Sequence, residues 1–274
     1  MYTIQKASML KRISAFLLDF ILMTIAVTGF AFIISLITGY SGHLDKLSER
    51  EAYYESKYYP EFGITEEQYN ALGAEAKAAY AYDFDIIGTE KYDALTEAEK
   101  TNIMNAYKSL LEDDDYSYAY SMLFNLTLIM ITFSLLLSFI LLEMVIPKIF
   151  GNGQTVGKKV FALGIVHVNA VRLSGVGNFT RVILGKFTVE TMIPVIMAMM
   201  LFTGGGLTGL LVLGLLIILE IFVFFKNKLC TPIHDVLAQT VCVDMSVQLV
   251  YENEDELIKH KERIHAEIVK DSDY

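Results

Sequence analysis

The sequence predicts an all-α multi-pass membrane protein with four transmembrane helices, a helical extracytoplasmic insertion and a small cytoplasmic β element. Hydrophobic residues make up 54% of the 274-residue chain, and the mean hydropathy is +0.43. Several uncharged runs are about twenty residues long, which is the length that a helix needs to cross a bilayer. The segments between these runs carry charges of opposite sign, as expected for segments on opposite sides of a membrane.

The distribution of charge predicts the orientation of the chain. Residues 1–12 carry three Lys/Arg and no acid, and residues 147–186 carry six Lys/Arg and no acid. Residues 39–120 carry seven Lys/Arg against eighteen Asp/Glu. Because short basic segments stay on the cytoplasmic side, both termini are predicted to be cytoplasmic and the acidic insertion to be extracytoplasmic.

Residues 1–38 comprise the N-terminus and the first predicted span. The apolar run contains Asp19 and ends without a small-residue cleavage pattern, so we interpret it as a retained helix and not as a signal peptide. Arg12 and Asp19 are seven residues apart and therefore lie on the same helix face. A carboxylate within a bilayer costs roughly 2.5–3.5 kcal/mol, which makes Asp19 a candidate functional residue. The alternative is that Asp19 only fixes helix packing.

Residues 39–120 form the extracytoplasmic insertion, for which we predict two to four helices with breaks near Pro60 and Gly88. Two stretches that begin at Thr65 and Thr96 fit the capping box of a helix N-terminus. The insertion holds 13 of the 16 tyrosines. These aromatic side chains either form a surface that binds a partner or sugar rings, or pack between helices and at the membrane interface.

Residues 121–146 are the second predicted span. Asn125, Thr132 and Glu143 share one face of this helix, because their separations are close to whole turns. A polar stripe on a spanning helix is expected to face protein or water, and the inward direction of crossing places Glu143 near the cytoplasmic side.

The basic loop of residues 147–186 contains a glycine-rich stretch that invites comparison with a phosphate-binding loop. Its spacing differs, since three residues separate Gly153 from Gly157 and Lys159 stands where Ser or Thr should bind magnesium. We therefore expect no nucleotide site. Further along, residues 174–186 are predicted to form an amphipathic helix on the inner leaflet.

Residues 187–225 are predicted to form a hairpin of the third and fourth spans, with an interruption at Pro194 and a tight glycine turn at residues 204–206. Glu190 lies near the start of the third span and Glu220 near the end of the fourth. Four acids thus fall at a similar depth on the cytoplasmic side of four helices, and they are the candidate ion- or proton-binding residues: Asp19, Glu143, Glu190 and Glu220.

The cytoplasmic segment of residues 226–274 contains a second strand-like pattern. Apolar residues alternate over 241–249, and this strand could pair with residues 160–168 to form a small sheet. Residues 252–270 are predicted to be a highly charged helix with a narrow apolar stripe, which is either solvated or faces a partner.

The sequence offers little support for a cofactor or an enzyme. Cys230, His234 and Cys242 match no paired zinc-ligand spacing, so we expect neither a metal nor another cofactor. His234 beside Asp235 could form a dyad, but no convincing nucleophile with a base accompanies it. We therefore expect no catalytic residues.

Three separated blocks of the chain resemble the RDD family of bacterial integral membrane proteins. The first block runs from Lys11 to Asp19, the second from Gly153 to Lys158 with the region around Arg181, and the third from His234 to Thr240. By this resemblance Arg12, Asp19 and Asp235 match the arginine and the two aspartates of the family name. The further matching positions are Gly153, Gln154, Thr155, Gly157, Lys158 and His234.

The resemblance implies a multi-pass protein of the bacterial cell membrane more firmly than it implies an activity. Cation/proton antiport is associated with some members, and the family often has a much shorter connection between the first two spans. We therefore hypothesise a transport or transport-accessory role, in which the four acids bind a monovalent cation or exchange protons and Arg12 modulates Asp19.

The alternative is a non-transporting scaffold or sensor whose acidic insertion binds an envelope partner. Four spans are few for a complete transporter, so the transport hypothesis implies a homo-oligomer or a larger complex. The expected partners are accordingly the lipid bilayer, a monovalent cation or proton, and a second copy or an envelope protein, but no nucleic acid.

Overall fold

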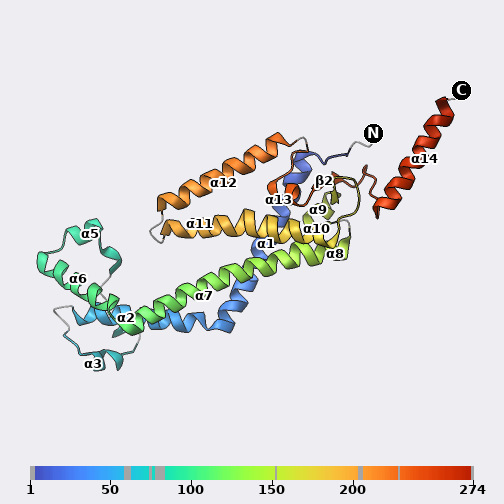
Figure 1. Ribbon diagram of the computed structural model, residues 1–274. Coiled ribbons are helices and arrows are strands. Elements are labelled where there is room, and N and C mark those ends of the chain that lie inside the picture. The colour runs from blue at the N-terminus through green and yellow to red at the C-terminus, as the bar shows by residue number, and fades with distance from the viewer. Residues whose placement is uncertain are drawn as a thin grey trace. The chain divides into compact units, whose positions relative to one another are not determined.

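The structure is a computed structural model (Figure 1) that describes residues 4–58, 63–73, 76–77, 84–151, 153–202, 206–227 and 229–272. The chain divides into two compact units, one of Met1–Phe30 with Thr132–Tyr274 and the other of Ala31–Ile131. Within these described ranges, four helices are long and apolar enough to cross a membrane: Met9–Thr38, Asp114–Phe150, Gly175–Met200 and Gly206–Lys226. The predicted class, an all-α multi-pass membrane protein, is confirmed.

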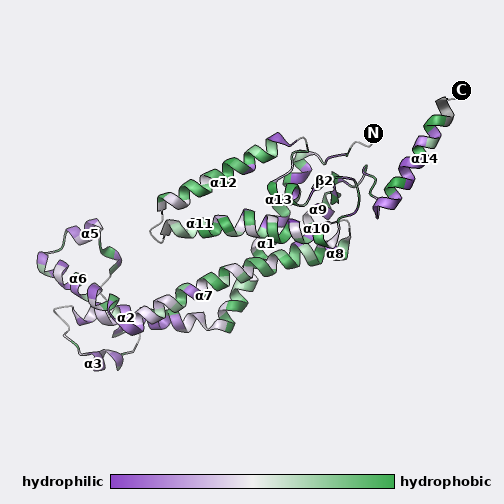
Figure 2. Cartoon of the chain, in the orientation of Figure 1, coloured by the Kyte–Doolittle hydropathy of each residue, from purple (hydrophilic) through white to green (hydrophobic). Residues whose placement is uncertain are grey.

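The first and fourth spans are regular α-helices, α1 (Met9–Thr38) and α12 (Gly206–Lys226). Figure 2 shows α12 as almost continuously hydrophobic, whereas α2 and α14 carry many hydrophilic residues. Of the predicted glycine turn before α12, residues 204 and 205 lie outside the described part of the chain.

The second span is longer than the predicted 121–146. It runs without interruption through α7 (Asp114–Phe139), the π-helical η2 (Ile140–Val145) and α8 (Ile146–Phe150). The wider turns of a π-helix are rare and often occur at functional sites. Here the π-helical turns contain Glu143, the acid of this span.

The third apolar helix begins before residue 187, where the predicted hairpin starts. One continuous helix runs through α10 (Gly175–Phe179), the π-helical η3 (Thr180–Met192) and α11 (Ile193–Phe202). The residues that were predicted to lie on the inner leaflet therefore form its first turns. Pro194 does not interrupt the helix, since it lies in the first turn of α11, directly after the π-helical segment.

Ser174 sets the start of this third span. Its side-chain oxygen accepts a hydrogen bond from the Gly177 N–H, which satisfies one of the donors left free at a helix start. We expect Ser174→Ala to lower the free energy of unfolding by about 1 kcal/mol, whereas Ser174→Asp retains the cap. Denaturant unfolding of the detergent-solubilised variants tests this, and equal stability of Ser174→Ala and wild type would contradict it.

A two-stranded antiparallel sheet joins the two segments in which strands were predicted. β1 (Leu163–His167) pairs with β2 (Thr240–Asp244), in the register Leu163 opposite Asp244 and His167 opposite Thr240. The N-terminal segment adds to this sheet, since the Ala7 N–H donates to the Cys242 carbonyl. Lys11 at the start of α1 also forms an ion pair with Asp244 at 2.6 Å. The sheet therefore anchors the first turn of α1.

The insertion is helical, as predicted. Its described elements are α2 (Tyr40–Lys57), α3 (Glu66–Asn70), the short 3₁₀ helix η1 (Phe84–Ile86), α5 (Glu90–Asp93) and α6 (Glu97–Leu111). Both predicted capping boxes are present, with Thr65 and Gln68 at α3 and Thr96 and Glu99 at α6. Gly88 has a φ of +83° between η1 and α5, while Pro60 lies outside the described residues.

Tyrosines have two roles in the insertion. Tyr53 and Tyr69 are buried, with ring centroids 5.2 Å apart, which supports the packing interpretation for these two. Tyr118 and Tyr120 at the start of α7 are exposed. Arg50 links α2 to this region through ion pairs with Asp113 and Asp115 and also binds Glu66.

The C-terminal helix was also predicted. α14 (Glu254–Ser272) is strongly charged, and its apolar stripe is only partly covered. Leu257 is buried against Ala170 and Tyr251, whereas Ile268 is exposed.

Candidate functional site

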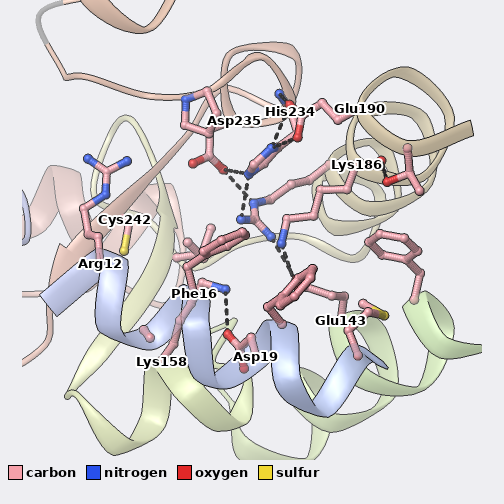
Figure 3. A pocket seen from close by; sticks show the side chains of 18 of the residues that line it. Arg12, Phe16, Asp19, Glu143, Lys158, Lys186, Glu190, His234, Asp235 and Cys242 are labelled. Carbon is pink, nitrogen blue, oxygen red and sulfur yellow. Dashed lines mark hydrogen bonds and ion pairs between the residues drawn. The ribbon is translucent and has the colours of Figure 1, made fainter. Parts of the chain in front are cut away.

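A cavity of about 490 Å³ lies among the first, second and third spans, the short helices α9 (Val156–Val160) and α13 (Ile233–Leu237), and the sheet. Its size is within the range of small-ligand sites in proteins. Figure 3 shows charged side chains from several of these elements converging on it. The charged or titratable residues of its lining are Arg12, Asp19, Glu143, Lys158, Arg181, Lys186, Glu190, His234, Asp235 and Cys242.

Arg181 is the centre of this charge cluster. Its Nε donates to Asp235 Oδ1 at 2.6 Å, and one terminal nitrogen lies 3.5 Å from Glu143 Oε2. The other terminal nitrogen lies 3.2 Å from His234 Nε2. All three ionised side chains are buried, so each charge depends on the others for compensation. Arg181 thereby joins the second span, the third span and α13.

Asp235 is held in its ionised form by these contacts. Burial is the largest single effect on the Asp235 carboxyl and by itself would raise its pKa. The charge of Arg181, the influence of His234 and the hydrogen bonds from Arg181 and Thr240 together outweigh burial and hold this pKa well below its usual value. The Thr240 hydroxyl also donates to Asp235 Oδ1 at 2.8 Å. Asp235 is therefore an anionic anchor between α13, β2 and the third span.

His234 has a defined tautomer in this arrangement. A guanidinium can only donate hydrogen bonds, so the contact with Arg181 requires an unprotonated Nε2 on His234. The proton is consequently on Nδ1, which lies 2.7 Å from Glu190 Oε2 and donates to it. Burial, reinforced by the charges of Arg181 and Lys186, lowers the pKa of His234 against the opposing effects of Asp235 and Glu190. We infer a neutral imidazole.

Glu143 and Lys186 form a second buried pair. Lys186 Nζ donates to Glu143 Oε1 at 2.5 Å. The other carboxylate oxygen of Glu143 is buried and has no hydrogen-bond partner among the described residues; its contact is the ion pair with Arg181. Both partners lie in π-helical turns, η2 and η3, which also face the cavity. The carboxylate thus keeps one oxygen that accepts no hydrogen bond from the described residues.

Asp19 holds the loop after the second span against α1. Its carboxylate accepts hydrogen bonds from the Thr155 hydroxyl at 2.5 Å and from the Gly157 N–H at 2.7 Å. Lys158 Nζ lies 3.7 Å away and supplies the opposite charge. A Cβ at Gly157 would lie 2.3 Å from the Ala15 carbonyl oxygen, so only glycine permits this close approach.

Arg12 lies in the same cavity lining as Asp19, as the seven-residue spacing predicted. In the described part of the chain, however, the ion-pair partner of Asp19 is Lys158, and Arg12 forms no ion pair. The Arg12 guanidinium instead lies 5.9 Å from the centroid of the Phe224 ring. The structure therefore shows no direct contact, within the described residues, that would support the hypothesis that Arg12 modulates Asp19.

Three of the remaining predicted residues do not line the cavity. Glu220 does not line the cavity, and its carboxylate accepts a hydrogen bond from the Ile233 N–H at 3.3 Å. Gly153 has a φ of +62° and packs on the backbone of Ile165. Gln154 Nε2 donates to the Leu163 carbonyl at 2.9 Å. These two loop residues therefore fasten the loop to β1 and do not contact the cavity.

Sequence reasoning missed the roles of Lys158, Arg181 and Lys186 as partners of the acids. The signal that could have indicated them is charge complementarity. The segment 147–186 carries six cations and no acid, and the predicted spans carry the acids. Since buried charges need partners, the cations of this segment were the available counterions.

The fold and the site define a multi-pass membrane protein with a buried, mutually compensated charge cluster at the ends of its spans. A family model described as the RDD family matches residues 6–239, and the chain belongs to this family. The matched range covers the four spans and every charged residue of the cavity lining. No curated protein and no solved structure matches the chain.

Proposed function

We propose that this RDD family protein exchanges a monovalent cation for a proton at the Glu143–Lys186 pair. The observation that carries the proposal is the buried ion pair at 2.5 Å on the wall of a cavity, in which Glu143 keeps one oxygen without a hydrogen bond. Intramembrane acids of this kind mark ion and proton pathways in many membrane proteins.

The exchange follows from competition for one carboxylate. A cation that binds Glu143 replaces the ammonium group of Lys186 as its counterion. A buried ammonium without a counterion is unstable, so Lys186 releases one proton to water in the cavity. When the cation leaves, Lys186 takes up a proton and pairs with Glu143 again. Charge in the cavity is the same before and after, since one positive charge enters and one leaves.

The neighbouring contacts keep this exchange local. Arg181 stays charged because Asp235 and Glu143 surround it, and it fixes the position of Glu143 at 3.5 Å. Asp19 is engaged with Thr155, Gly157 and Lys158, and we assign it a positioning role.

The proposal extends to orientation and assembly. The basic segments 1–12 and 147–186 support cytoplasmic termini and a location in the bacterial cell membrane, with the cavity near the cytoplasmic side. Four spans per chain support a homo-oligomer that completes a sealed pathway. A non-transporting scaffold is the alternative, favoured by the exposed Tyr118 and Tyr120 beside an acidic insertion.

Proton flux in liposomes tests the exchange. We expect sodium or potassium pulses to change the internal pH of liposomes that contain wild-type protein and a pH dye. Glu143→Gln should reduce this flux to that of empty liposomes, because the amide cannot compensate a cation. Glu220→Gln is the matched control and should retain the flux, since Glu220 lies outside the cavity.

The flux experiment also separates the two functions. Equal flux in Glu143→Gln and wild type would refute the proposed site. Absence of flux in wild type would favour the scaffold, for which deletion of residues 45–115 should abolish partner binding while leaving the four spans.

A further inference from the structure

The cavity has an apolar side that the exchange does not use. Phe16, Phe20 and Met23 line it from α1, with the charged Arg12 at its end, and Leu135 and Phe139 line it from α7. The four residues of α1 are spaced by four, four and three positions, which puts them on one helix face. The Phe16 and Phe20 rings are stacked with centroids 6.1 Å apart. This wall follows the axis of the first span.

Among the described residues, no carboxylate compensates the charge of Arg12, whose guanidinium lies 5.9 Å from the centroid of the Phe224 ring. Asp19 pairs with Lys158, Glu143 with Lys186 and Asp235 with Arg181, whereas Arg12 has no carboxylate within ion-pair distance in the described ranges. It lies within the first turn of α1, and basic residues at the ends of spans are typical of the membrane interface. A guanidinium presents several donors that suit a phosphate group.

The polarity of this wall matches that of a membrane lipid. Phe16 and Phe20 are 64% and 58% exposed, so this side of the cavity is open. Arg12 and Met23 are eleven residues apart, or roughly 16 Å along a helix, which is comparable to the length of an acyl chain. If α1 spans the bilayer from its first turn, the charged end is expected at the headgroup level and the aromatic stretch deeper.

We propose that one anionic phospholipid occupies this open side, with its phosphate on Arg12 and an acyl chain along Phe16, Phe20 and Met23. Basic residues at the ends of spans bind anionic headgroups in this manner. The bound chain separates the charge cluster from bulk lipid, which favours access to Glu143 through water. This inference does not depend on the exchange reaction.

A tryptophan reporter tests lipid binding directly, because the chain contains no tryptophan. Phe20→Trp places the fluorophore on the cavity wall, and Ile217→Trp places one on the exposed surface of α12 as a control. Each protein is reconstituted in mixed vesicles of phosphatidylcholine and phosphatidylglycerol, in which one or the other lipid is brominated at equal mole fraction. Bromine quenches tryptophan only at close range.

We expect brominated phosphatidylglycerol to quench Phe20→Trp as strongly as if this lipid were enriched roughly fivefold over phosphatidylcholine next to residue 20. An enrichment of this size corresponds to one cation close to an anionic lipid. The Ile217→Trp protein should show no preference. In the Phe20→Trp background, Arg12→Gln should abolish the preference, whereas Arg12→Lys and the exposed control Lys148→Gln should retain it.

Equal quenching by both brominated lipids at residue 20 would overturn the proposal. A preference that survives in Arg12→Gln would overturn the assignment of the headgroup to Arg12. Size-exclusion chromatography and circular dichroism show whether each variant is folded. If Arg12→Gln does not fold, Arg12→Lys still tests the assignment, because this variant should retain the preference.

Discussion

Replacement of Arg181 with glutamine is expected to lower the free energy of unfolding by about 3–5 kcal/mol, because it leaves buried carboxylates without their counterion. Asp235 loses its closest cation, at 2.6 Å, and Glu143 loses one of its two. His234 also loses the donor to its Nε2. Denaturant titration in mixed micelles measures the change.

Arg172→Gln is the matched control for this prediction. Arg172 pairs with Glu252 at 2.8 Å, but the side chain of Arg172 is 43% exposed. An exposed ion pair contributes at most about 1 kcal/mol, so this variant should unfold close to wild type. If both arginine variants lost the same stability, the assignment of Arg181 as the buried centre of the cluster would be wrong.

Gly185→Ala is expected to separate the third span from α13. A Cβ at this position would lie 2.5 Å from His234 Cβ and 2.7 Å from His234 Cα, which is closer than carbon atoms can pack. One added methyl group at such a contact costs about 1–3 kcal/mol. The clash displaces α13 from the third span, which moves His234 away from Glu190 and Asp235 away from Arg181. Cation-dependent proton flux should therefore fall together with stability.

Gly214→Ala on α12 is the control, since a Cβ there would meet no atom within 4 Å among the described residues, apart from its chain neighbours and the backbone of its own helix. This variant should be neutral or stabilising by up to about 1 kcal/mol, because alanine favours a helix more than glycine does. A Gly185→Ala protein as stable and active as Gly214→Ala would show that η3 and α13 do not pack as described.

Elements that depend on local sequence were predictable. The capping boxes at Thr65 and Thr96 follow from residues three positions apart, and both are present. The strands β1 and β2 follow from apolar runs and alternation, although their pairing joins segments far apart in the chain. The spans follow from hydropathy, because an apolar helix of sufficient length has few alternatives.

The start of the third span was not predictable from hydropathy. Arg181 and Lys186 give residues 174–186 the composition of a surface helix. In the structure these two cations are neutralised by Asp235, which is 54 residues away in the chain, and by Glu143, which is 43 residues away. A scale that treats each residue alone counts such charges as solvent-exposed, so it does not indicate that the helix is continuous through residues 175–202.

The candidate site was predictable only in part from the sequence. Depth along the helices grouped Asp19, Glu143 and Glu190, which line the cavity, but it also included Glu220, which does not. Depth does not specify the direction in which a side chain points around the helix axis. The partner of Asp19 depends on how α9 packs against α1, which the spacing within α1 cannot indicate.

The central claim is that a cation displaces Lys186 from Glu143 and thereby releases a proton. Calorimetric titration of the solubilised protein with sodium and potassium, in two buffers of different ionisation enthalpy, measures proton release upon binding. We predict release of about one proton per bound cation in wild type, binding without release in Lys186→Met, and no binding in Glu143→Gln. Cation binding without proton release in wild type, or unchanged release in Glu143→Gln, would contradict the exchange at this pair.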